Sequence, residues 1–251
     1  AFNVSDVGFD PVRLARIDSL CEHSVQKNIL PNVVTFVARH GQIVHYKAYG
    51  YRNREKNIPA QKDDIFRLAS MSKAIVTTAL MTLYEEGKFL LDDPLAKYIP
   101  AFSNMKVMEN FDPVKGTYTT RPAKGQITIR HLLTHTSGIH YGDLSGNKLY
   151  EKAGIPVLHC KDSLTIAQVV ERLAAQPLMH DPGAGWTYGL NTDVVGRLVE
   201  IFSGKPLDVA LKERIFDPLG MKDTWFYLPE KDYPRLVTLR QGTSRQPAEI
   251  V

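Results

Sequence analysis

Ser70 and Lys73 are spaced so that a hydroxyl and an amine meet on one side of a predicted helix. The segment from Met71 to Glu86 has the length and apolar content of a buried helix. Ser70 is therefore expected at its first turn, with Lys73 three residues later over the same face. A serine becomes nucleophilic when a neighbouring base takes its proton, and the helix N-terminus disfavours a positive charge on Lys73. This Ser-x-x-Lys pattern predicts a nucleophile with a lysine base.

The surrounding sequence decides between this interpretation and a simpler one. By itself the pattern is more often a serine cap followed by a solvated lysine. Ser72 is a weaker nucleophile candidate than Ser70, because adjacent helix residues do not face each other. No Gly-x-Ser-x-Gly occurs, which removes the nucleophile elbow of another hydrolase class.

Five ordered segments supply the context of the motif. They are Phe66–Lys73, Leu90–Leu95, Ile129–Gly138, Asp181–Tyr188 and Pro218–Thr224. In this order and spacing the chain resembles the class C β-lactamase-like serine hydrolases, which include esterases, acyltransferases and D-amino-acid peptidases, and Ser-x-x-K is a signature of such enzymes. The resemblance extends from about residue 10 to about residue 228. It implies an α/β, β-lactamase/penicillin-binding-protein-like fold, in which helices flank an antiparallel sheet that carries a mostly helical insertion.

The second motif of the resembled family is a tyrosine followed two residues later by asparagine. Tyr188 matches the tyrosine, and the resemblance implies that it relays a proton between Ser70, Lys73 and the leaving group. Leu190 stands where the asparagine is usual, and Asn191 comes one residue late. We expect Leu190 and Asn191 to line the substrate site, together with Trp186 at the acyl pocket. A leucine cannot pair with a substrate amide, so this departure favours the esterase branch.

The third family motif, a Lys-Thr-Gly or His-x-Gly strand near the C-terminus, does not occur in its place. Lys115-Gly116-Thr117 has another order and precedes Tyr188. In the family this strand supplies the second N–H of the oxyanion hole, and the loss of one donor costs about 2.7 to 4 kcal/mol of transition-state stabilisation. The C-terminal strands are thus expected to be absent from this chain. A truncated sequence, an internally cleaved protein and a separate C-terminal fragment that completes the fold are the alternatives.

Local patterns divide the chain into three expected parts. Residues 1–70 hold an N-terminal helix, opened by Asp10-Pro11 and reaching about Asn28, and a hairpin of two strands, 33–39 and 42–51. Residues 71–228 form a helical part with the nucleophile helix and the tyrosine motif, and residues 229–251 begin a truncated C-terminal part. Further helices are expected after a capping box at Thr165, from Thr192 to Phe202 and from Leu207 to Phe216.

Composition is that of a globular enzyme. The net charge of +4 comes from 31 basic and 27 acidic residues without a basic cluster, so nucleic acid is not an expected partner. No apolar stretch is long enough to span a membrane. Cys21 and Cys160 lie in no metal or redox spacing, and His131 and His135 fit the family's structural turn better than a zinc site. A start at Ala1 without Met or an apolar signal fits a processed secreted protein or a trimmed sequence. A periplasmic or secreted location is slightly favoured over a cytoplasmic one.

The function expected from these residues is a cofactor-free, metal-free serine hydrolase. Its partner is a small-molecule ester or lactam, and it works through an acyl-enzyme, as a carboxylesterase does. The alternatives are a β-lactamase, a D-amino-acid peptidase, or a catalytically silent, penicillin-binding-like binding protein. The missing third motif favours only the silent protein.

Overall fold

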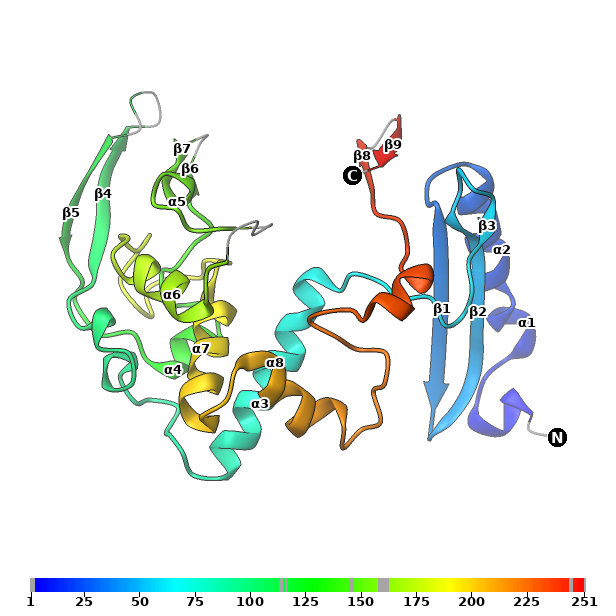
Figure 1. The fold of residues 1–251 in the computed structure, drawn as a ribbon, viewed down its shortest axis with the longest axis horizontal. Coiled ribbons are helices and arrows are strands. Elements are labelled where there is room, and N and C mark those ends of the chain that lie inside the picture. The colour runs from blue at the N-terminus through cyan, green and yellow to red at the C-terminus, as the bar shows by residue number, and fades with distance from the viewer. Residues whose placement is uncertain are drawn as a thin grey trace. The chain divides into compact units, whose positions relative to one another are not determined.

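The computed structural model of the chain describes residues 3–112, 115, 117–144, 147–157, 163–243 and 246–250. The chain divides into two compact units, which are described separately (Figure 1). One comprises Ala1–Leu68 with Trp225–Val251, and the other comprises Ala69–Thr224. The three-part division at residues 70 and 228 stays a prediction.

The first unit is built on an antiparallel hairpin. Strand β1 (Asn32–Arg39) pairs with β2 (Gln42–Asn53), and the short β3 (Ile58–Pro59) continues the sheet in the order β1-β2-β3. His40 and Gly41 join β1 to β2 with φ angles of 50° and 75°. Positive φ at both central residues is the geometry of the two-residue turn that matches strand twist. The predicted hairpin is therefore confirmed.

Two helices accompany this sheet. After the 3-10 turn η1 (Val4–Val7), α1 (Pro11–Leu14) is followed by α2 (Arg16–Gln26). The side chain of Asp10 accepts hydrogen bonds from two N–H groups of α1, as its capping role predicts. Asp18 of α2 accepts a 2.8 Å hydrogen bond from Lys47 Nζ and a further one from Tyr49, which fix α2 against β2. The single helix expected to reach about Asn28 is thus interrupted at Ala15 and ends at Gln26.

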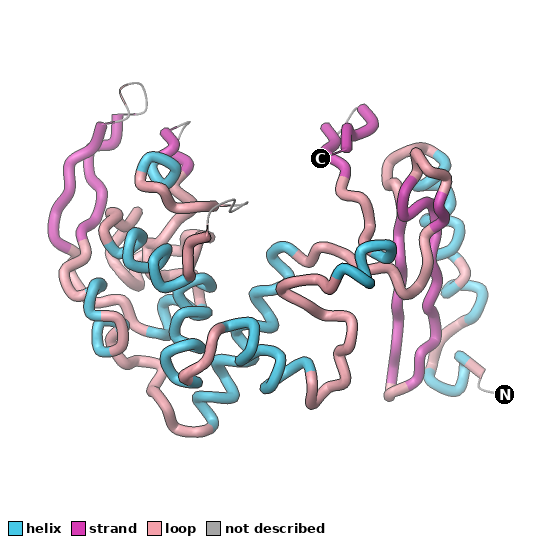
Figure 2. Tube along the Cα trace, viewed as in Figure 1, coloured by secondary structure: helices cyan, strands magenta, loops and turns pink. Residues whose placement is uncertain are grey.

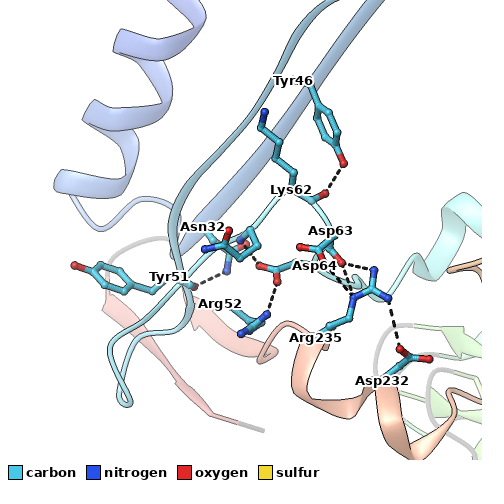
Figure 3. A network of polar contacts seen from close by, with 10 residues as sticks. Asn32, Tyr46, Tyr51, Arg52, Lys62, Asp63, Asp64, Asp232 and Arg235 are labelled. Atoms are coloured by element: carbon cyan, nitrogen blue, oxygen red, sulfur yellow. Dashed lines mark hydrogen bonds and ion pairs between the residues drawn. The ribbon is translucent and has the colours of Figure 1, made fainter.

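The segment after residue 229 belongs to this same unit. It contains η6 (Glu230–Arg235), β8 (Arg240–Thr243) and β9 (Gln246–Ile250). Arg235 donates two hydrogen bonds to the carbonyl oxygen of Asp63, at 3.0 and 2.6 Å (Figure 3). Nearby, Arg52 donates to Asp64 at 2.7 Å. The Arg235 hydrogen bonds attach the late segment to the loop that follows β3, and the Arg52 hydrogen bond attaches this loop to β2.

The second unit is mainly helical, as Figure 2 shows. Its helical segments are η2 (Ala69–Met71), α3 (Ser72–Glu85), η3 (Leu95–Lys97), η4 (Pro100–Phe102), α4 (Ile129–Leu133), α5 (Leu149–Lys152), α6 (Ile166–Ala174), α7 (Asn191–Ser203), α8 (Leu207–Leu211) and the π-helical turn η5 (Lys212–Phe216). Two hairpins accompany them, β4 (Lys106–Asp112) with β5 (Thr117–Pro122), and β6 (Asp143–Leu144) with β7 (Asn147–Lys148).

Helices α3 and α7 form the centre of this unit. They pack against each other, and Leu80 and Leu83 of α3 and Val194 and Leu198 of α7 are fully buried. The spacing of three or four residues puts each pair on one face of its helix. Burial of such side chains contributes about 1.5 to 3 kcal/mol each, so this contact gives α3 a rigid support.

Local helix signals were predicted well. Thr165 makes the expected capping box with Gln168 at the start of α6, and α7 ends at Gly204 with a φ of 69°. The helix expected over 207–216 is instead α8 followed by η5. Antiparallel sheets with a mostly helical insertion are present, as expected for the fold class. No helix among the described residues has both the length and the apolar character needed to cross a membrane.

Candidate active site

Ser70 lies in the 3-10 turn η2, immediately before α3. Lys73 is the second residue of α3, and its Nζ lies 3.2 Å from Ser70 Oγ. Ser70 is exposed, and the preceding Ala69 has a φ of 46°. A non-glycine residue in this conformation stores of order 1 kcal/mol or more of strain and often marks a functional site. The hydroxyl and the amine therefore meet as predicted, although Ser70 belongs to the 3-10 turn and not to the α-helix.

Tyr188 completes this group. Lys73 Nζ lies 4.9 Å from the centroid of the Tyr188 ring. Hydrogen bonding to Ser70, and then to Lys73, lowers the pKa of the Tyr188 phenol from its usual value near 10. A lowered pKa favours the phenolate, which accepts protons. The structure thus brings Ser70, Lys73 and Tyr188 together within unit 2.

Tyr141 is a fourth member of the site that the sequence reasoning missed. Its ring lies 5.5 Å from that of Tyr188, at 60°. Burial raises the pKa of the Tyr141 phenol, and the neighbouring Lys73 acts in the opposite direction. Tyr141 follows the Ile129–Gly138 segment by three residues, so its proximity to a recognised landmark was the available signal.

The Lys73 amine has two tyrosines as hydrogen-bond partners. Burial acts to lower the pKa of its amine, but hydrogen bonds with Tyr188 and Tyr141 outweigh burial and raise that pKa above its usual value. These hydrogen bonds therefore act against the neutral Lys73 that was expected from its place at the helix N-terminus.

Backbone hydrogen bonds hold the two tyrosines next to each other. Thr187 N–H donates to His135 O at 2.8 Å, and Met179 N–H donates to Gly138 O at 2.8 Å. The backbone of Gly189 also lies against the backbone of Ile139. A Cβ added at Gly189 would fall 2.3 Å from Ile139 O. This close approach requires glycine at position 189, and it fixes the distance between the segments that carry Tyr141 and Tyr188.

Trp186 presents an open aromatic surface beside this group. Its side chain is 68% exposed, and its ring is nearly parallel to that of Tyr188, at 6.1 Å and 17°. An exposed indole beside Tyr188 is a suitable surface for an apolar group.

Leu190 and Asn191 are placed differently from the expectation. Leu190 is 3% exposed and belongs to the hydrophobic core, and Asn191 is fully buried. The Asn191 amide accepts from Ser137 Oγ at 2.5 Å and donates to Ile139 O at 3.3 Å. Its remaining N–H points to His135 Nδ1 at 3.0 Å. We therefore correct the expectation that these two side chains contact substrate, because neither is accessible.

The two histidines of the Ile129–Gly138 segment have separate partners. His131 Nδ1 accepts a 3.2 Å hydrogen bond from Thr128 N–H at the start of α4, and His135 Nδ1 is paired with Asn191. Across the described part of the chain, no three histidine, cysteine or acidic side chains are grouped as metal ligands would be. Cys21 is a buried free thiol, and Cys160 lies outside the described residues.

The chain is similar to known proteins over most of its length. The Beta-lactamase family profile matches residues 17–251. Esterase EstB of Burkholderia gladioli is 35% identical over 219 residues, covering 87% of this chain and 53% of that protein. Lovastatin esterase of Penicillium rubens is 35% identical over 198 residues, covering 78% and 48%.

A solved structure extends the comparison to the fold. EstCE1, described as a hydrolase with promiscuous acyltransferase activity, superimposes with a TM-score of 0.81 at 30% identity over 95% of this chain and 58% of its own. The chain thus spans about half the length of these relatives, and its fold is β-lactamase/penicillin-binding-protein-like. On its sequence match and on this fold, the chain belongs to the beta-lactamase family.

Proposed function

We propose that the protein is a serine hydrolase that cleaves small esters through an acyl-enzyme intermediate. The observation that carries this proposal is the 3.2 Å contact between Lys73 Nζ and Ser70 Oγ, next to a tyrosine of lowered pKa. A nucleophile, a proton acceptor and a fixed positive charge are the groups that acyl transfer requires. The names of the relatives, esterase EstB and lovastatin esterase, support the same class of reaction.

Each step of the proposed reaction uses these groups. Tyr188, as the phenolate, takes the proton of Ser70 while Ser70 Oγ attacks the ester carbonyl carbon. Tyr188 then gives that proton to the oxygen of the leaving alcohol as its bond to the carbonyl carbon breaks, and the acyl group stays on Ser70. Water then attacks the acyl carbon and gives its proton to Tyr188, and the acid is released as Ser70 regains a proton. Throughout, the Lys73 ammonium stabilises the negative charge on the phenolate and on Ser70 Oγ.

Preference for esters over lactams and peptides rests on what surrounds Tyr188. Leu190, two residues later, is buried and does not reach the substrate, so the preference rests on Trp186. The exposed ring of Trp186 favours an apolar acyl group or alcohol instead.

We propose further that a C-terminal segment, in the same chain or as a separate fragment, completes the fold. Among the described strands β1 has a neighbour on one side only, because the sheet order is β1-β2-β3. An open strand edge is a pairing site for another strand. In the resembled family the late strand also gives the second oxyanion donor, so full activity is expected to depend on it.

A covalent probe tests the proposed function. A fluorophosphonate should label the protein at Ser70, with Ser72→Ala as the matched control that keeps full labelling. The ratio of kcat/KM for p-nitrophenyl butyrate to that for nitrocefin should favour the ester. An unlabelled protein supports the silent binding alternative, which the absence of a Lys-Thr-Gly sequence favours. A preference for nitrocefin overturns the esterase assignment.

A further inference from the structure

His135 packs directly against the proposed proton acceptor. Its ring lies 4.9 Å from the Tyr188 ring and 6.2 Å from the Trp186 ring. Its carbonyl oxygen accepts the Thr187 N–H at 2.8 Å, so both its ring and its backbone contact the segment that ends in Tyr188. No step of the proposed reaction yet uses this histidine.

A buried hydrogen-bond chain fixes which nitrogen of His135 carries the hydrogen. Ser137 Oγ accepts the Ile139 N–H at 3.0 Å and directs its own hydrogen to Asn191 Oδ1 at 2.5 Å. The Asn191 amide is thereby oriented with its Nδ2 toward Ile139 O and His135 Nδ1. An amide nitrogen only donates, so His135 Nδ1 must accept and the hydrogen resides on Nε2.

The backbone at His135 is also constrained. Its φ is 56°, in the left-handed region that few side chains other than asparagine, aspartate and histidine adopt readily. Ser137 and Asn191, which set the ring orientation, are both fully buried. These contacts therefore hold the His135 ring in one position. The strained backbone at His135 costs conformational free energy, as is often found at functional sites.

We propose that His135 is a positioning residue that holds Tyr188 in its proton-accepting orientation, and that it does so only as the neutral imidazole with hydrogen on Nε2. This inference rests on the proposed function of Ser70 and Tyr188. A proton added to Nδ1 would face the N–H of Asn191, and the two donors would repel each other. The ring would then leave its place against Tyr188.

The charges around His135 favour the neutral form. Burial, and then the positive charge of Lys73, lower the pKa of the His135 imidazole below its ordinary value of 6.5. The groups that face it are Lys73 from α3, Tyr188 and Trp186 from the preceding loop, and Asn191 from α7. In acid, where Tyr188 is a neutral phenol, none of these groups supplies a negative charge that would favour the imidazolium. Protonation of His135 therefore requires acid conditions.

The test combines a spectroscopic measurement with a pH profile on the full protein. Nitrogen-15 NMR of the wild type should show the Nε2–H tautomer of His135 at pH 7. The logarithm of kcat/KM for p-nitrophenyl butyrate should rise with pH at unit slope where only Tyr188 titrates. Below the pKa of His135 the slope should steepen, because a second proton then inactivates the enzyme.

His135→Asn is the diagnostic variant, because asparagine accepts the left-handed backbone. We expect kcat to fall about 10²-fold with little change in KM, and the acid steepening to disappear. His131→Asn is the matched control: its amide oxygen can replace the His131 cap, and the steepening should remain. Ser137→Ala, which frees the Asn191 amide to rotate, should give a mixture of His135 tautomers.

Two results would overturn the inference: an Nδ1–H tautomer in the wild type, or steepening that persists in a folded His135→Asn protein. If that variant does not fold, the wild-type tautomer and the Ser137→Ala spectrum decide the matter. If Ser70 is not labelled by fluorophosphonate, the proposed function fails by that measurement, whereas the tautomer still reports on His135 itself.

Discussion

Gly189 lies against the backbone of His140, so closely that a Cβ at position 189 would fall 2.6 Å from His140 Cα. The neighbouring atom belongs to the backbone and cannot rotate away, so Gly189→Ala must push the Tyr188 segment away from the Tyr141 segment. A displacement of about 1 Å in a catalytic group lowers kcat about 10²-fold, and we expect a loss of this size in ester hydrolysis. Gly125→Ala is the control, because a Cβ there meets nothing within 4 Å. Full activity in Gly189→Ala would show that the tyrosine spacing is unimportant.

Lys73 and Tyr188 are expected to act as one unit. Lys73→Ala and Tyr188→Phe should each lower kcat by about 10² or more, and the double variant should be little worse than either single variant. The reason is that the phenolate depends on the ammonium beside it. Tyr227→Phe, at an 80% exposed position, is the matched control. Losses that multiply in the double variant would contradict a shared proton relay.

The buried His140 predicts a stability that depends on pH. Burial lowers the pKa of its imidazole to about 4, against a weaker opposing contact with the Pro177 backbone, and Nδ1 accepts from Gly142 N–H at 2.8 Å. Because the folded state binds the proton less well than the unfolded state, this stability is complete above the unfolded pKa near 6.5. It is lost as pH falls toward 4, by on the order of 3 kcal/mol.

Urea unfolding at several pH values measures this effect. His140→Gln should show a smaller fall in the free energy of unfolding between pH 7 and pH 4.5 than the wild type. His23→Gln, which removes an imidazole from the exposed surface of α2, serves as the control. Equal pH dependence in His140→Gln and the wild type would remove His140 as the source.

Leu190→Asn should change stability and not substrate preference. The side chain is 3% exposed in the core, so an amide there loses its water without gaining a designed partner. We expect the free energy of unfolding to fall by about 1 to 3 kcal/mol, with the ratio of ester to nitrocefin turnover unchanged. Leu219→Asn, at a 70% exposed position, should be nearly neutral. A shift toward nitrocefin would show that position 190 does reach the substrate.

Trp186→Ala tests the proposed substrate contact. Because Trp186 stacks beside Tyr188 and is otherwise open, its removal should raise KM for p-nitrophenyl butyrate about twofold to tenfold while kcat changes little. Trp225→Ala, which removes the other, partly exposed tryptophan, is the control. A fall in kcat at constant KM would instead assign Trp186 to the support of Tyr188.

The features that were predicted correctly are those set by near neighbours in the chain. The His40-Gly41 turn, the Thr165 cap and the pairing of Ser70 with Lys73 each depend on residues at most three apart. The burial of Asn191 depends on Ser137, 54 residues earlier, and no local pattern announces such a contact. The hydrogen bonds of Lys73 with Tyr141 and Tyr188 could not be foreseen for the same reason, because both phenols come from distant segments.

The open edge of β1 has a consequence for handling the protein. Phe36 on β1 is 58% exposed and Ile43 on β2 is 54% exposed. The charged residue nearest to Phe36 in the sequence is Arg39, three positions later. A strand that is apolar and has a partner on one side only among the described strands can recruit the same strand of another molecule. These residues expressed without a covering strand should therefore self-associate, and a lysine at position 36 should act as a gatekeeper that keeps the molecules apart.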